Sequence, residues 1–593
     1  MAEPPVSAGE QSASRRSAWA ARAVWVPMAL AGLFALALAV RLPRILEAIS
    51  WNADALAPGL IAERAAEMDP LGPPVGPTVL GDISSASTLW FHLLTEGVPG
   101  HRVIWTWAPV MVLLATAALI GWTCSRLAGR WAGVLGGGLV LAAGSDALLT
   151  FLAPAFRGPT WLSVALLGAT LVWWAEHAHE PPAASLALGI MVAGFVGVNL
   201  ASDPLLGLAG VAPLALAAGW VWLRARTART RRVMGLAAGT AVAAAGVGMA
   251  SSWALHAAGY VTRREHFGGG YLMVASPGEL VDHIALIGRN ILALAGAPGM
   301  GGQAQGLAAL RWPLALLALA ALAVALWGRR PASAGAPPAG PEASAGRVLA
   351  RRLFLAYWTL GAALVSVGYL LSDIPSGDVL ISVPATRYVI PLLLATLAVL
   401  PVIAFGARVE AHRRVAAAVA AAAVVTGAGI GLVRGDIELA QRSELSQQAD
   451  RMADWLGDQG VERGYAGYWT AGPLSRHTDL RVLAVRRCVQ GSLDTLCPVA
   501  LNGRFDWYLP SVVESSFVVV GGARPGDALL PEAWRGAFGA PALTRRFGDL
   551  VVRVYPYDMA ERLAPSWRPY PDERVAERAP AAGEESSPER AVR

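Results

Sequence analysis

The sequence contains no lysine, so all 48 of its basic residues are arginine. Charged residues of both signs make up only 15% of the chain, whereas soluble domains have about 25%. Together with 55% hydrophobic residues, this shortage of charge favours a chain with most of its surface in lipid. The arginines occur in many short segments between apolar runs and not on one solvated face, so no nucleic-acid partner is expected.

The sequence also lacks several catalytic signatures. It has no Walker motif, no zinc-type Cys/His spacing and no convincing Ser-His-Asp order, which argues against nucleotide hydrolysis, a zinc centre and a serine hydrolase. Of the three cysteines, Cys488 and Cys497 lie close together in the polar C-terminal region. If that region is outside the cytoplasm, the compartment favours a disulfide between them. A metal pair would need more ligands than the nearby His477.

Apolar runs dominate the first 433 residues. Many reach the roughly 20 residues needed to cross about 30 Å of hydrocarbon. The first is too long for the apolar part of a cleaved signal peptide, about 7–15 residues, and is expected to remain as a membrane helix. We place about eleven spans, with ends uncertain by roughly 2–4 residues, at 21–40, 103–122, 131–153, 159–175, 183–202, 204–223, 233–257, 312–328, 353–372, 387–407 and 415–433.

Arginines are concentrated in alternate connections. Segments 126–130, 224–232, 329–352 and 408–414 are rich in arginine, whereas the short connections between them carry one at most. The positive-inside rule therefore predicts a multi-pass cell-membrane protein with a cytoplasmic N-terminus. Arg41 and Arg44, at the opposite end of the first span, are exceptions. An odd number of spans then places the C-terminal region outside.

The composition changes after residue 433. Residues 434–560 are predicted to form a small extracytoplasmic α/β domain, and 1–20 and 561–593 are expected to be disordered. The predicted fold class is thus a polytopic α-helical membrane protein with a small C-terminal α/β domain. Within that domain we expect a helix at 437–456 and strands at 465–469, 481–485, 516–520 and 550–555.

Asp54 is the strongest catalytic candidate. It stands in Trp51-Asn52-Ala53-Asp54, shortly after the first span, where a carboxylate would lie at the outer mouth of the bundle. Acids beside membrane spans are costly to bury and are functional candidates by default. A helix N-cap for the residues that follow is the alternative, and the two interpretations stay open.

Other acids are expected at the same face. Asp82 lies in the same outer connection as Asp54 and could hold a metal or a substrate hydroxyl, although a structural turn or cap is favoured. Asp203 lies at the outer junction of two apolar runs, where Asp-Pro also favours a simple turn. Asp146 lies inside an apolar run and requires a partner.

Two arginines are candidates for phosphate binding. Arg157 lies in a very short outer connection, where it could bind a phosphate bidentately or anchor the helix at the headgroup level. Arg387-Tyr388 opens a late span at the same predicted mouth as Asp54. This pair suits a lipid-linked phosphate, and an interfacial Arg/Tyr anchor is the alternative.

The span count, the outer C-terminal domain, Trp51-Asn52-Ala53-Asp54 and Arg387-Tyr388 together resemble the C-type integral-membrane glycosyltransferases, which include protein O-mannosyltransferases and lipid A aminoarabinose transferases. The resemblance implies an inverting transfer from a polyprenyl-phosphate-linked sugar, with Asp54 acting near the acceptor. It implies a divalent cation, Mg²⁺ or Mn²⁺, for some members. Many members carry an acid in the second outer loop. Arg157 stands there in this chain, so Asp203 or Asp82 would have to take that role.

The sequence therefore predicts a cell-envelope glycosyltransferase with a polyprenyl-phosphate sugar donor, membrane lipid around it and an unidentified acceptor. Arg387, Tyr388, Arg157, Asp203 and Asp82 are the expected substrate-binding residues. Two other classes remain: a transporter or flippase, which predicts internal repeats and a polar path through the bilayer, and a non-catalytic scaffold, in which Asp54 only caps a helix.

Overall fold

The structure is a computed structural model of the 593-residue chain. It describes residues 22–51, 56, 78–80, 95, 98–153, 157–178, 182–201, 203–224, 227–257, 260–262, 276–297, 306–326, 341–372, 386–406, 409–437, 448–487, 496–499, 503–504, 508, 513–521, 538–548 and 550–562.

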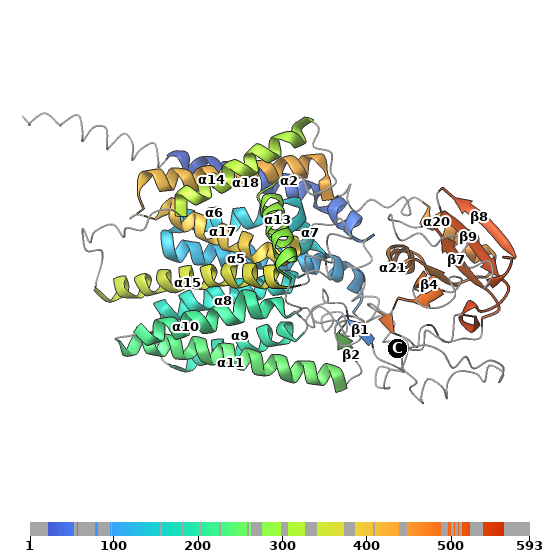
Figure 1. The fold of residues 1–593 in the computed structure, drawn as a ribbon, viewed down its shortest axis with the longest axis horizontal. Coiled ribbons are helices and arrows are strands. Elements are labelled where there is room, and N and C mark those ends of the chain that lie inside the picture. The colour runs from blue at the N-terminus through green and yellow to red at the C-terminus, as the bar shows by residue number, and fades with distance from the viewer. Residues whose placement is uncertain are drawn as a thin grey trace, which may run out of the picture.

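A helical bundle and a smaller α/β domain make up the described chain (Figure 1). The long helices run side by side, and the C-terminal domain lies beyond one end of them, called the domain end here. The bundle contains α2 (Trp25–Ile49), α5 (His101–Ala128), α6 (Arg130–Leu141), α7 (Ser145–Leu152), α8 (Gly158–Glu176), α9 (Pro182–Leu200), η1 (Gly207–Val211), α10 (Ala212–Arg224), α11 (Ala228–Ala257), α13 (Pro277–Leu294), η2 (Gly306–Leu310), α14 (Arg311–Leu326), α15 (Pro341–Leu371), α17 (Thr386–Phe405) and α18 (Ala411–Arg434).

These helices confirm a polytopic membrane protein. Among the described residues, 9 helices are long and apolar enough to cross a membrane, and the bent pair α6–α7 raises the number to 10. A shorter apolar helix, Gly207–Leu223, lies where another span is expected. Every predicted span thus has a helical counterpart.

Two features of the bundle differ from expectation. The span predicted at 131–153 is bent by 84° between α6 and α7. A helix that is not among the predicted spans also occurs between the spans predicted at 233–257 and 312–328. That helix, α13, begins with a capping box: Ser276 Oγ accepts from Glu279 N, and the Glu279 carboxylate accepts from Ser276 N. In Figure 1 it crosses in front of α17, roughly at right angles to the spans.

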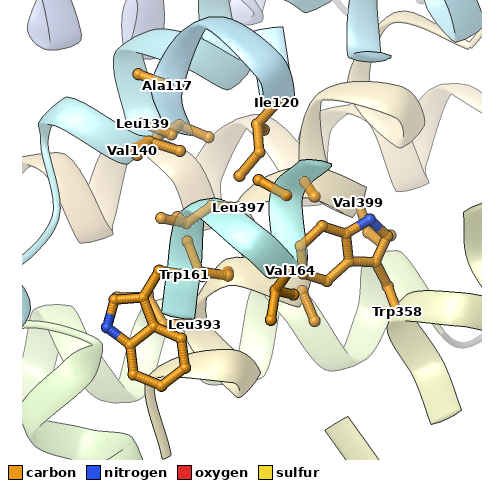
Figure 2. Close-up of a cluster of buried hydrophobic side chains, with 14 of the residues drawn as sticks. Ala117, Ile120, Leu139, Val140, Trp161, Val164, Trp358, Leu393, Leu397 and Val399 are labelled. Atoms are coloured by element: carbon orange, nitrogen blue, oxygen red, sulfur yellow. The ribbon is translucent and has the colours of Figure 1, made fainter. Parts of the chain in front are cut away.

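The bundle core forms where α5, α6, α8, α15 and α17 meet. Figure 2 shows Trp161, Ile120 and Leu397 from three of these helices side by side in that core. Small residues allow the tightest contact: a Cβ added to Gly121 of α5 would lie 2.9 Å from the carbonyl oxygen of Gly133 in α6. Close backbone approach through small residues is how membrane helices gain packing without a hydrophobic driving force between them.

The C-terminal domain is built on a 6-stranded sheet of order β5-β4-β3-β7-β9-β8. Its central strands β4, β3 and β7 are parallel, and the two edges are antiparallel. The elements are α20 (Ala449–Asp458), β3 (Arg463–Ala466), α21 (Tyr468–His477), β4 (Arg481–Arg487), β5 (Leu496–Pro498), β7 (Ser516–Val520), β8 (Leu543–Phe547) and β9 (Leu550–Tyr555).

The four strands predicted in this domain are present, with one correction. Tyr468 and Trp469, expected at the end of a strand, form the first turn of α21. Gly467 alone separates β3 from this helix, so aromatic content there is misleading as a strand signal. A second sheet of 3 short strands, ordered β2-β1-β6, joins β1 (Thr78–Leu80) and β2 (Tyr260–Thr262) to β6 (Gly503–Arg504).

Candidate functional site

Four of the predicted substrate-binding residues lie together at the domain end. Arg157 immediately precedes α8, Asp203 follows α9, and Arg387 and Tyr388 lie in the first turn of α17. Helices α8 and α17 begin at this end and α9 finishes there, so the alternation of the spans brings residues more than 200 positions apart into one cluster. We call Arg157, Thr160, Asp203, Arg387 and Tyr388 the arginine cluster.

A buried ion pair forms the base of the arginine cluster. Arg157 Nη1 donates to Asp203 Oδ1 at 2.8 Å, and the two side chains are 5% and 3% exposed. Thr160 Oγ1 donates to Asp203 Oδ2 at 2.5 Å, and Leu205 N donates to Oδ1 at 3.2 Å. The Asp203 carboxylate is therefore bonded at both oxygens, which is what a buried charge pair needs to be tolerated. Asp203 serves both in the expected turn and in a tertiary contact.

Tyr388 lies against both arginines. The Arg157 guanidinium carbon is 4.7 Å from the centroid of its ring, and that of Arg387 is 5.0 Å away. Both distances are within the range of cation–π attraction. Arg387 Nη2 also donates to the Tyr388 hydroxyl at 3.4 Å. Tyr388 is 7% exposed, whereas Arg387 is half-buried, so Arg387 is the more accessible of the two guanidinium groups.

A donor of the arginine cluster remains available. Arg157 Nε is buried and has no hydrogen-bond partner within the described part of the chain. Buried donors are nearly always satisfied, so a water molecule or a bound group is expected to accept from this one. A guanidinium N–H is suited to a phosphate or carboxylate oxygen.

An apolar groove lies further along α17, the helix that begins in the arginine cluster. It has a volume of about 450 Å³ and is bordered by α13, α14, α15, α17 and α18. Leu392, one helical turn after Tyr388, lines it, and Thr396 and Val399 continue the same face of α17. Its hydroxyl-bearing residues are Thr359 and Thr396, and the Thr396 hydroxyl donates to Leu392 O. A hydrocarbon chain suits such walls.

The other predicted residues are not placed. Asp54, Asp82 and Cys488 lie outside the described residues, and nothing is known of the side chain of Cys497. The catalytic role of Asp54 and the Cys488–Cys497 disulfide therefore stay predictions. Within the described ranges no three His, Cys, Asp or Glu side chains are grouped to hold a metal, and the divalent cation also stays a prediction.

Sequence analysis missed a second buried polar cluster. Arg311, at the start of α14, forms an ion pair with Asp436, just after α18. Its Nε also donates to Gly296 O at 2.6 Å. Asp146 of α7 lies within electrostatic range of both side chains. The sequence signal for this cluster was the position of Arg311, a charged residue at the start of an apolar run.

The fold defines a multi-pass membrane protein with a buried, arginine-containing polar cluster at the domain end. No family model and no curated protein matches the sequence. Among solved structures, ArnT from Cupriavidus metallidurans in the apo state matches with a TM-score of 0.42 and 14% identity, over 90% of this chain and 99% of that one. At this distance, no residue role is transferred from it.

Proposed function

We propose that the protein transfers a sugar from a polyprenyl-phosphate donor to an acceptor at the domain end, which the distribution of arginine predicts to be extracytoplasmic. The observation that carries the proposal is the arginine cluster at the start of α17, whose following turns line the apolar groove. Guanidinium donors suit the phosphate, and the apolar walls suit the prenyl chain. A ligand with both parts is a phosphate-bearing lipid.

In this proposal the arginine cluster holds the leaving group. The glycosidic bond between sugar carbon and phosphate oxygen breaks, and negative charge grows on the phosphate. Arg387 and the Nε of Arg157 would stabilise that charge. Asp203 and Thr160 keep Arg157 in place, so these two residues act on the phosphate indirectly.

Asp54 would accept the proton of the acceptor hydroxyl as its oxygen bonds to the sugar carbon. Attack from the side opposite the phosphate inverts the configuration at that carbon. Where a divalent cation takes part, Asp54 is the carboxylate proposed to hold it, with Asp82 as a further candidate. Asp54 follows Trp51 by three residues, and Trp51 lies at the domain end.

The binding step is tested first, with farnesyl phosphate as the probe and farnesol as the control with the same chain and no phosphate. Full-length protein in nanodiscs should bind farnesyl phosphate more tightly than farnesol. Arg387→Ala should weaken farnesyl phosphate binding about 10- to 100-fold, because charge-assisted hydrogen bonds are lost, and should leave farnesol binding unchanged. Arg231→Ala, an exposed arginine at the other end of the bundle, is the matched control. Equal affinities for the two probes would contradict the proposal.

The transfer step is tested by the release of polyprenyl phosphate from a panel of lipid-linked monosaccharides. Asp54→Asn should reduce release at least about 100-fold, since a general base contributes that much, while farnesyl phosphate binding is retained. Release at the wild-type rate from a folded Asp54→Asn protein would refute the catalytic role. Translocation of the lipid without sugar release would instead establish a flippase.

A further inference from the structure

We propose that the C-terminal domain clamps the connection between α2 and α5, residues 50–100, and that Arg476 and His477 are the positioning residues of this clamp. The clamp itself rests on contacts in the structure. Its effect on transfer rests on the proposed function, because Asp54 lies in the clamped connection.

The first contact is at the beginning of the connection. The rings of Trp51 and His477 are stacked, with centroids 4.0 Å apart and planes 6° from parallel. His477 Nε2 also donates to the carbonyl oxygen of Ser50 at 2.8 Å. Trp51 further packs against the apolar core of the C-terminal domain. Three residues before Asp54, the chain is therefore held by a ring contact, a hydrogen bond and apolar packing.

The second contact is at the other end of the connection. The guanidinium carbon of Arg476 lies 5.3 Å from the centroid of the Trp105 ring, in the first turns of α5. Trp105 Nε1 donates to Thr95 Oγ1 at 2.8 Å, and its ring meets His101 edge to face at 4.9 Å. Arg476 thus contacts the residue that ties Thr95 to α5.

The third contact lies between the other two in the sequence. Strand β1 pairs antiparallel with β6, with Thr78 opposite Arg504 and Val79 opposite Gly503. On its other side β1 pairs with β2, which follows α11. The C-terminal domain therefore contacts the connection near its start and middle, and beyond its end contacts Trp105, the α5 residue bonded to Thr95.

The element that bears Arg476 and His477 is suited to holding a fixed position. The two are the last residues of α21, which follows the buried strand β3 after Gly467 alone. Ser475 fixes this turn to β4, because its hydroxyl donates to Val482 O and accepts from Val482 N. Basic side chains at a helix C-terminus are also favoured by the helix dipole. One anchored helix end thus reaches both ends of the connection.

Hydrogen–deuterium exchange of the full-length protein in nanodiscs tests the clamp. His477→Ala should speed amide exchange in residues 50–58 roughly three- to tenfold, the range for loss of a ring contact. Arg476→Ala should do the same for residues 95–105. His477→Phe, which keeps an aromatic ring but loses the donor to Ser50, should fall between His477→Ala and wild type. Asp479→Asn, exposed and two residues further on, is the matched control and should change neither segment.

Transfer assays separate the clamp from the proposed function. His477→Ala should lower kcat while the Kd for farnesyl phosphate is unchanged, because Asp54 is displaced and the arginine cluster is not. Unchanged exchange in both segments for both alanine variants would overturn the clamp. Should the His477 variants not fold, Arg476→Ala alone decides. Faster exchange together with full transfer by Asp54→Asn would support the clamp and refute the catalytic role of Asp54.

Discussion

The two ends of the helical bundle use arginine in different ways. At the domain end, Arg157 and Arg311 are buried and paired with Asp203 and Asp436. At the far end, the described arginines are exposed or partly buried: Arg126, for example, is 47% exposed and pairs with Glu176.

Arginines at the far end also donate hydrogen bonds to carbonyl oxygens at the ends of neighbouring helices. Arg229 Nη2 and Arg232 Nη1 donate to carbonyl oxygens at or just beyond the end of α8, and Arg413 Nε donates to Ala325 O at the end of α14. These contacts satisfy carbonyls that have no partner within the helix. The comparison teaches that burial, and not the presence of an acidic partner, distinguishes Arg157 and Arg311 from Arg126.

The largest expected effect is at the buried pair. Arg157→Ala leaves the Asp203 carboxylate buried without its counter-charge and should lower the free energy of unfolding by about 3–5 kcal/mol. Thermal unfolding in detergent measures the loss. The double variant Arg157→Met with Asp203→Leu should recover most of it, because no charge is then left buried. If the double variant is as unstable as Arg157→Ala, the ion pair is not the cause.

The next test replaces a buried arginine by lysine, the residue type that the chain lacks. Arg311→Lys keeps the positive charge near Asp436 but loses the planar fork that also reaches Gly296 O and Ala297 O. We expect a loss of about 1–3 kcal/mol in the free energy of unfolding, the range for hydrogen bonds to charged groups and buried polar atoms left unpaired. Wild-type stability of Arg311→Lys would show that charge alone is needed.

At the far end of the bundle, removing an arginine should change the free energy of unfolding only slightly. Arg126→Ala removes a surface pair with Glu176 and should change the free energy of unfolding by about 0–1 kcal/mol. Its effect should fall further as salt is raised, since exposed pairs are screened. A loss comparable to that of Arg157→Ala would abolish the distinction between the two ends.

The smallest effect concerns the acid at the start of α13. Hydrogen bonds from the Ser276 backbone and side chain lower the pKa of exposed Glu279. Because the folded-state pKa is lowered, the ionised Glu279 carboxylate stabilises the start of α13 above the unfolded pKa, about 4.3 for Glu. This stabilisation is lost as pH falls through the lower folded-state pKa. Glu279→Gln should therefore speed amide exchange in the first turn of α13 at neutral pH, and match wild type well below pH 4. A difference in amide exchange between Glu279→Gln and wild type that persists in acid would show that protonation of Glu279 is not the cause.

Sequence reasoning located the spans because hydropathy and length respond to the bilayer, which acts on each helix separately. It also predicted that Arg157, Asp203 and Arg387-Tyr388 lie at the same end of the bundle, because alternating spans fix which helix ends lie on the same side. It could not pair Arg157 with Asp203, or Arg311 with Asp436, since tertiary packing decides which side chains meet. The bend between α6 and α7 occurs within an apolar run and leaves no mark in hydropathy. The capping box of α13, in contrast, was readable in Ser276-Pro277-Gly278-Glu279 and was overlooked.

The pairing of β1 with β6 also sets an order of assembly. β1 ends at residue 80 and β6 begins at residue 503, so the ribosome must make nearly the whole chain before this sheet can close. At about 5–20 residues per second, roughly 20–85 s pass between the two strands. During that interval the connection that carries Asp54 has left the ribosome without its partner strand. Completion of this sheet therefore waits for β6, and any truncated chain that stops before residue 503 lacks the pairing of β1 with β6.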